Sequence, residues 1–314
     1  MRRTPIRRAA RGRVDVCVRL GLLAAVALLA AGCAGASAGT GGGRVRVVAA
    51  ENFWGSIARQ LGGDQADVDS IIVNPAQDPH AYEPTTGDAR ALATAQLAIV
   101  NGVGYDPWAP RLLNANPVDG RLTLTVGSLL GRRDGDNPHR WYDPADVTRV
   151  AQAITADLEK LDPARRAYFT QRLRQFDGPG LAEYHRLIAE IKQRYSGVPV
   201  GASESIFALL APALGLRLIT PDSFMKAISE GTEVTAQDTI ATEHQLTGHA
   251  IKVWVDNSQN ITPEIQRLNG LARAAGIPIA TVTETLSPAS DSFQQWQVAQ
   301  LTEIAAALRR ATGR

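Results

Sequence analysis

The sequence predicts an α/β fold of two lobes, each a mostly parallel sheet flanked by helices, joined by a long connecting helix with a cleft between the lobes. Three observations predict this architecture. The chain has 314 residues, 45% of them hydrophobic and 20% charged, which is enough for two domains of ordinary size. Short Val-, Ile- and Ala-rich runs alternate with helical stretches in both halves, as in βαβ units. Between the halves, residues 162–195 contain no strand-like run.

The first half has the alternation of strands and helices expected of an N-terminal lobe spanning residues 44–161. We expect its strands at residues 45–50, 68–73, 96–102 and 121–126. A short helix over 53–63 ends in glycine, and a second begins at Thr85, whose partner Asp88 completes a capping box. A third helix, over 143–161, has Pro144 in its first turn and a clear apolar stripe.

The second half repeats this pattern after the connector. Residues 162–195 predict one long helix that Pro179 breaks or kinks. Residues 196–314 then form the C-terminal lobe, with strands expected at 197–202, 216–220, 251–257 and 277–283. Four helices are expected in this lobe. One ends at Leu214, one begins at Thr235 with Asp238, one begins at Thr262–Pro263, and the last runs through Arg310.

Residues 1–32 have the composition of an export signal. A basic stretch precedes an apolar run over residues 20–31 that is too short to span a membrane as a permanent helix. The run ends in Gly32–Cys33 and resembles a lipobox, with Ala30 where leucine is usual. We therefore expect a lipid on Cys33, a flexible tether over 33–43, and a protein anchored to the cell membrane outside the cytoplasm. A plain secretory signal with an incidental cysteine is the alternative.

The charge of the remaining chain excludes one class of partner. The first 32 residues contain seven Arg and one Asp, and subtracting this +6 from the formal net charge of +2 leaves −4. An acidic body without a basic run interleaved with aromatics argues against nucleic acid. The only other cysteine, Cys17, lies inside the signal, so the mature chain has no disulfide available.

Two histidines share an unusual local setting. His80 lies in DPHAYEPT, just beyond the strand expected to end near Val73, and His139 lies in NPHRWYDP. Each follows a proline and is followed by an aromatic residue and a carboxylate. Because ligands of open α/β sheets bind beyond the carboxyl ends of the strands, both histidines are candidates for a binding site.

Two glutamates occupy the corresponding position in the second lobe. Glu204 follows the strand in VPVGASES, and Glu284 follows the strand in IPIATVTET. A carboxylate that is poorly solvated is costly unless a cation or hydrogen-bond donors compensate. Two imidazoles and two carboxylates would suit Mn, Fe(II) or Zn better than Cu(I), Ca or Mg. The residue types also leave open that these are strand-end residues that cap helices.

Five segments together resemble a known family. DPHAYEPT, NPHRWYDP, ASESIFALLAPALGL, WVDNSQ and TVTETLSP, in this order after a lipoprotein-like signal, are similar to the metal-binding solute-binding lipoproteins of ABC importers, the zinc- and manganese-type cluster A-I. The resemblance implies that His80, His139, Glu204 and Glu284 are the four metal ligands, with Glu284 in place of the usual Asp. It also implies capture of a divalent metal and its delivery to a permease with its ATPase. We expect a monomer without enzymatic activity.

The metal itself is only weakly indicated. Zinc-scavenging members carry a histidine-rich loop near the second ligand, whereas residues 114–136 contain no histidine. This absence and Glu204 favour manganese or iron. Zinc stays open, because an N2O2 site binds Zn more tightly than Mn in the Irving–Williams order.

Several aromatic residues are expected near the site. Tyr82 and Trp141 each lie two residues after a predicted ligand histidine and, with Trp54 and Glu83, are expected to form the cleft wall. Core packing is an equally compatible role for the tryptophans, Trp108 included.

Two other functions remain to be tested against transport. One is a surface adhesin or interaction protein with the same fold and a structural metal. The other is a hydrolytic metalloenzyme, for which Glu83 is the only nearby general base. His244 and His249 do not have the H-E-x-x-H spacing of zinc proteases, and we expect them at a polar face or a helix end. His185 is expected on the connecting helix, where it is solvated or bonded locally.

Overall fold

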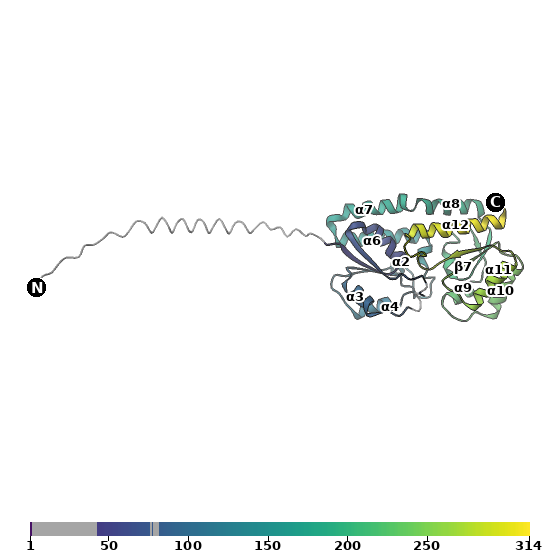
Figure 1. The fold of residues 1–314 in the computed structure, drawn as a ribbon, viewed down its shortest axis with the longest axis horizontal. Helices are drawn as coiled ribbons and strands as arrows, with labels where there is room; N and C mark the ends of the chain where they lie inside the picture. The colour runs from purple at the N-terminus through teal and green to yellow at the C-terminus, as the bar shows by residue number, and fades with distance from the viewer. Residues whose placement is uncertain (2–42, 76, 78–81) are drawn as a thin grey trace. The chain divides into compact units, whose positions relative to one another are not determined.

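The computed structural model describes residue 1 and residues 43–75, 77 and 82–314 (Figure 1). The predicted signal peptide, the tether and Cys33 lie outside these residues, and so does His80. Residues Arg44–Arg314 form one compact unit, which is described below by itself.

The first half of this unit contains a four-stranded sheet with all strands parallel, in the order β2-β1-β3-β4. The strands are β1 (Val45–Glu51), β2 (Ala66–Ile72), β3 (Leu97–Val100) and β4 (Leu122–Thr125). The helices are α2 (Asn52–Gly62), α3 (Thr86–Thr94), α4 (Trp108–Ala115), α5 (Val126–Leu129) and α6 (Pro144–Leu161), with short 3₁₀ turns η1 (Gly63–Gln65) and η2 (Arg140–Tyr142). The predicted capping box of Thr85 and Asp88 begins α3.

The second half repeats the topology with a sheet ordered β6-β5-β7-β8, again entirely parallel. Its strands are β5 (Pro199–Ala202), β6 (Arg217–Leu218), β7 (Val253–Asn257) and β8 (Ile279–Val282). Its helices are η5 (Ser205–Leu209), α9 (Asp222–Ser229), α10 (Ala236–Thr247), α11 (Pro263–Ala274) and α12 (Phe293–Thr312). The α/β fold predicted from the alternating pattern is therefore confirmed.

The segment between the sheets is helical but interrupted. After the turn η3 (Pro163–Arg165) come α7 (Arg166–Gln175), the π-helix η4 (Phe176–Gly180) and α8 (Ala182–Tyr195). The expected break falls at Pro179, which lacks the N–H of a regular helix and lies inside η4. Helix α12 packs along α8 (Figure 1).

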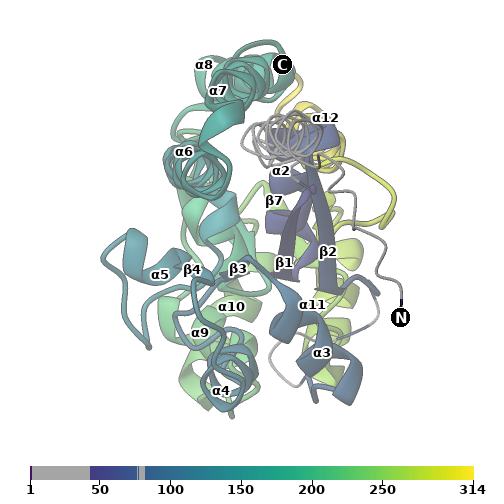
Figure 2. The same cartoon turned by 90° about the vertical axis from the view of Figure 1, so that its left-hand side faces the viewer.

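The two faces of the first sheet are covered by different helices (Figure 2). Alternate residues of β1 point to opposite faces. Val47 and Ala49 pack in the main core with α2 and α6, whereas Val48 and Ala50 pack in a smaller cluster with α3 and α4. The main core continues into the second half, because the same buried cluster includes residues of both sheets and of α12. Helix α12 also bonds to α2, where Phe293 N donates to Ser56 Oγ over 2.9 Å.

Both strand orders contain a point where the chain reverses its direction across the sheet. In the first sheet this point lies between β1 and β3, and in the second between β5 and β7. The connections from such neighbouring strands diverge to opposite sides, so a crevice opens beyond their carboxyl ends. Each half thus offers one natural place for a ligand.

One helix prediction was wrong, and helices α4, α5 and α9 were not anticipated. The helix expected up to Leu214 is only the 3₁₀ turn η5 followed by turns. Glu204, directly before it, is fully extended (φ −158°, ψ −179°), and Pro212 cannot donate a helical hydrogen bond, so little length is left for an α-helix.

In the part of the chain that the structure describes, no helix combines the length and the apolar character needed to cross a membrane.

Candidate metal centre

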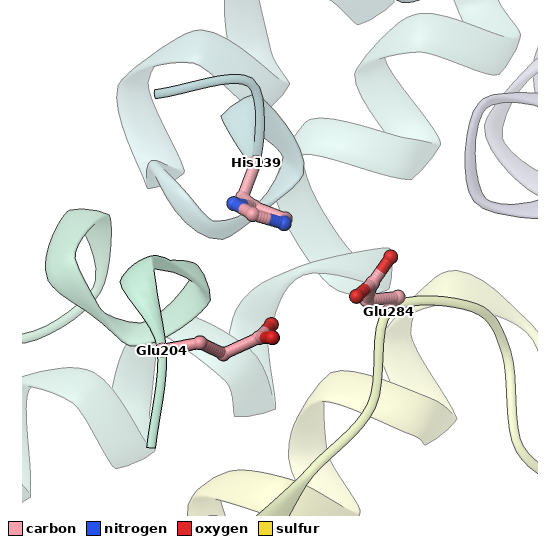
Figure 3. A group of neighbouring side chains, drawn as sticks. All are labelled: His139, Glu204 and Glu284. Atoms are coloured by element: carbon pink, nitrogen blue, oxygen red, sulfur yellow. The ribbon is translucent and has the colours of Figure 1, made fainter. Parts of the chain in front are cut away.

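Three of the four predicted ligand residues converge in the structure (Figure 3). His139, Glu204 and Glu284 each offer one donor atom within 4.8 Å of the others. His139 directly precedes η2, Glu204 follows β5, and Glu284 follows β8. Their side chains are almost completely buried, with exposed fractions of 0%, 0% and 4%. The fourth predicted ligand, His80, lies outside the described residues, so the structure does not place it.

The second lobe brings its two carboxylates together at the reversal point of its sheet. Asn257, the last residue of β7, donates from Nδ2 to Glu204 Oε1 over 2.7 Å and to Glu284 Oε1 over 3.1 Å. Asn260 Nδ2 donates to Glu204 Oε2 over 2.7 Å. One amide therefore bridges both carboxylates, and such outer partners orient groups that bind metals.

The backbone around Glu284 is fixed by a third amide. Gln259 Oε1 accepts from the main-chain N of Glu284 over 2.8 Å and from that of Thr285 over 2.9 Å. The sequence pattern did not reveal Asn257, Gln259 and Asn260 as contributors, although the segment WVDNSQ contains the first two. The available signal was the position of Asn257 at the end of a central strand, where polar side chains line the crevice.

The first lobe holds His139 by the residue two positions before it. Asn137 Oδ1 lies 2.9 Å from His139 Nδ1 and accepts from the His139 main-chain N over 3.0 Å, while its Nδ2 donates to Ser205 O over 2.6 Å. The amide is thus oriented with its oxygen toward the ring, so Nδ1 carries a hydrogen. Nε2 is then the nitrogen with a lone pair available for coordination.

A tyrosine connects the two lobes at the site. Tyr105 is fully buried, and its hydroxyl donates to Glu284 Oε2 over 2.9 Å. Burial, and after it the charge of Glu284, raises the pKa of Tyr105 well above its ordinary value. The phenol therefore stays protonated and acts as a donor at every physiological pH.

Aromatic rings surround His139, and Trp141 is the predicted wall residue that lies closest to it. The Trp141 ring lies edge-on to the His139 ring, with 5.3 Å between the ring centroids. It stacks on the Phe53 ring, with 3.8 Å between the centroids. Trp54 packs edge-on against Phe53 at 5.4 Å, and its indole N–H donates to Asn101 Oδ1 over 3.1 Å. Both tryptophans belong to the main core, so core packing and enclosure of the site coincide.

The structure describes the surroundings of the other two predicted wall residues, Tyr82 and Glu83. Tyr82 packs against Trp108 at 4.9 Å in the smaller cluster, and its hydroxyl donates to Asp88 Oδ2 over 2.8 Å. Glu83 is exposed to solvent. Among the other histidines, His185 and His249 are exposed, and His244 lies on α10.

The donor set fits a divalent transition metal. One neutral imidazole and two carboxylates are hard-to-borderline ligands that suit Mn, Fe(II) and Zn. The buried carboxylates are partly compensated by amide and phenol donors, and a cation would compensate the rest. These side chains could therefore hold a metal between the two lobes.

Two parallel α/β lobes with a buried donor set between them define the class of two-lobed solute-binding proteins. The family model for the periplasmic component A of the zinc-uptake complex matches residues 47–307. The chain belongs to this family.

Relatives and solved structures agree with this placement. The chain is 34% identical over 143 residues to the manganese-binding lipoprotein MntA of Halalkalibacterium halodurans, covering 44% of this chain and 47% of that protein, somewhat less than half its length. It is 25% identical over 234 residues to the manganese ABC transporter substrate-binding lipoprotein PsaA of Streptococcus anginosus, covering 69% of this chain and 73% of that one.

The fold matches that of periplasmic metal-binding proteins. The metal-free S38A mutant from Candidatus Liberibacter asiaticus superposes with a TM-score of 0.71 at 17% identity, covering 84% of this chain and all of that one (100%). The laminin-binding adhesin Lmb of Streptococcus agalactiae gives a TM-score of 0.67 at 20% identity, covering 85% and 100% of the two chains.

Proposed function

We propose that this protein is the extracytoplasmic solute-binding component of an ABC importer, which captures a divalent transition metal and delivers it to a permease driven by an ATPase. The observation that carries the proposal is the meeting of His139 with Glu204 and Glu284 in one buried site. Membership of the zinc-uptake family supports it, as do the names of the manganese-binding relatives.

In this proposal His139 and His80 supply two imidazoles, and Glu204 and Glu284 supply two carboxylates. The assignment of His80 is supported by its sequence motif alone. The cargo is manganese, zinc or iron(II), since relatives are named for manganese and, in Yersinia pestis, for iron, and the family is named for zinc. The site is then neutral when loaded, because two negative charges balance the divalent cation.

The binding site also suggests how cargo is held and released. The donors come from two separate lobes, so separating the lobes would divide the set and weaken the hold on the metal. Asn137 and Tyr105 cross between the lobes, through the bonds to Ser205 O and Glu284 Oε2. These contacts are expected to adjust when the permease draws the lobes apart.

The direct test is elemental analysis of the whole chain, stripped of metal and re-equilibrated with a buffered mixture of Mn²⁺, Fe²⁺ and Zn²⁺. One equivalent of metal is expected in the parent and none in a His139→Ala, Glu204→Ala double variant. A matched His244→Ala, Glu243→Ala variant on α10 should load like the parent. A parent without stoichiometric metal would overturn the proposal.

We further propose that the protein acts as a monomer held at the membrane by a lipid on Cys33. Changing Cys33→Ala should release the protein from the membrane fraction, and continued membrane binding would refute the lipid anchor.

The adhesin alternative, with a structural metal, is supported only by the fold shared with Lmb. Deleting the gene distinguishes the two functions, because only loss of an importer should slow growth when the medium is depleted of metal by a chelator.

A further inference from the structure

The first lobe contains a buried pair of carboxyl groups, Glu51 and Asp106. Glu51 is the last residue of β1, and Asp106 lies in the loop after β3, so both stand at the reversal point of the first sheet. Both are fully buried, with an exposed fraction of 0%. The two side chains interact with each other, through a hydrogen bond and through charge. Two neighbouring carboxyl groups in a dry environment do not readily both ionise, so sharing one proton is favourable for the pair.

The hydrogen bonds show which partner keeps the charge. Asp106 accepts from two main-chain groups, Asn101 N and Gly102 N, over 2.7 Å each. Neither oxygen of Glu51 accepts a hydrogen bond of normal geometry from a described residue. The two main-chain donors lower the pKa of Asp106 against the rise that burial causes, whereas burial, followed by the charge of Asp106, raises the pKa of Glu51 well above its usual range. The two main-chain donors thus favour the charge on Asp106 and the proton on Glu51, where a neutral carboxylic acid can act as a donor toward Asp106.

The turn that Asp106 holds supports both halves of the metal site. Asn101 Nδ2 donates to Pro138 O over 3.0 Å, one residue before His139. Tyr105, next to Asp106 in the chain, donates to Glu284 Oε2 over 2.9 Å. A shift of this turn would move the support of the imidazole and of the carboxylate together.

We propose that Glu51 is a positioning residue of the metal site, a neutral carboxylic acid that hydrogen-bonds to Asp106 and fixes the turn on which His139 and Glu284 rest. The inference rests on the proposed metal-binding function. With Glu51 neutral, the pair carries only the charge of Asp106, and Glu204 and Glu284 balance the divalent cation, whereas an ionised Glu51 would add a second negative charge to the pair. It would also repel Asp106.

The test compares Glu51→Gln with Glu51→Ala, because glutamine keeps the shape, the neutrality and a donor for Asp106. Zn²⁺ and Mn²⁺ affinities are measured by competition with a chelating indicator on the whole chain. Glutamine should bind within about threefold of the parent, and alanine about 10- to 100-fold more weakly, as is typical when an outer partner is lost. Asp177→Asn, a half-buried carboxyl in η4 whose pKa is also raised by burial, should leave the affinity unchanged.

A second measurement separates this inference from the proposed function. The folded-state pKa of Glu51 is raised, so its contribution to stability is complete below the unfolded pKa and is lost as pH rises toward the folded one. Among the described residues, Tyr105 interacts electrostatically with Glu51 and also with Glu284 and Glu204, and the parent and the Glu51→Gln variant share all three. The comparison uses metal-free protein between pH 5.5 and 8.5. As the pH rises over this range, the denaturant concentration at the unfolding midpoint should fall more for the parent than for the Glu51→Gln variant.

Each result decides the matter. If glutamine weakens metal binding as much as alanine, Glu51 acts as a carboxylate and the inference is wrong. Equal pH dependence of the parent and Glu51→Gln would also overturn it, and this comparison needs no bound metal. If alanine does not fold, the glutamine comparisons still decide. A parent that binds no metal refutes the proposed function, while the pH comparison still tests the protonation of Glu51.

Discussion

The two sheets of the molecule share one strand order, yet they contribute to the site in different ways. The second sheet places Glu204 and Glu284 two residues beyond β5 and β8, where Asn257 bridges them from the central strand β7. The first sheet supplies His139 from a loop well beyond β4, held by Asn137 and enclosed by aromatic rings. Because Glu204 and Glu284 lie so close to strand ends, the geometry of the strands sets the positions of their carboxylates. The position of the His139 imidazole is set instead by the packing of its loop.

This difference suggests that each lobe alone is an incomplete site. Carboxylates without imidazole would favour hard cations, and imidazole without carboxylates would lack the charge to balance a divalent ion. Variants of each lobe should therefore reveal whether both are needed.

The largest effect is expected from removing one ligand of either lobe. His139→Ala and Glu204→Ala should each weaken metal binding by more than about 100-fold, beyond the range typical of outer partners. Titration of the metal-free proteins with Zn²⁺ and Mn²⁺ in the presence of a competing chelator gives the affinities. Loss in only one of the two variants would show that the other lobe does not bind the metal.

Acidification should act mainly through the first lobe. Imidazole must be deprotonated to coordinate. Metal affinity should therefore fall as the pH is lowered, with a slope approaching two protons if His80 and His139 both bind. Isothermal titration at several pH values in buffers of different ionisation enthalpy counts the released protons. A slope near zero would argue against imidazole ligands.

A smaller effect is expected from the amide that bridges the carboxylates in the second lobe. Asn257→Ala should weaken metal binding by about 10- to 100-fold, because Glu204 and Glu284 lose their shared donor. Asn269→Ala is the matched control, since this buried amide contacts Trp254 and Asp256 but neither site carboxylate. If both variants bind metal equally well, the bridge does not orient the ligands.

The smallest effect is expected at Glu83. This side chain is exposed, so Glu83→Gln should change the free energy of unfolding by no more than about 0.5 kcal/mol and leave metal binding intact. Chemical denaturation and the chelator competition measure both. A large loss of affinity would show that Glu83 acts at the site, as the sequence suggested.

Much of the fold was predictable because the hydrophobic pattern changes period between strands and helices. Both parallel sheets follow from the alternation of runs such as VRVVAA and IKVWVDN with amphipathic stretches. The segment from Ser205 to Leu214 was not predictable in this way. Its composition suits a helix, but the extended backbone of Glu204 and the position of Pro212 leave only a 3₁₀ turn.

The site was predictable only in part, for a similar reason. Strand-end position pointed to Glu204 and Glu284, and the repeated Pro-His unit pointed to His139. The structure brings these three side chains together, and metal binding by them stays a prediction. Asn257, Tyr105 and the pair of Glu51 and Asp106 were missed, because their roles depend on contacts between distant segments. Sequence spacing could not show that the Tyr82 ring packs on Trp108, because that contact joins separate segments of the chain.

The account's central claim is that residues of both lobes bind one metal ion. The most direct test is a crystal structure of the Mn²⁺-loaded protein with diffraction data collected across the manganese absorption edge. The claim predicts a single anomalous peak within about 2.0–2.3 Å of His139 Nε2 and of one oxygen from each of Glu204 and Glu284. A peak bound by one lobe only, or no peak at this site in protein that carries one equivalent of manganese, would contradict it.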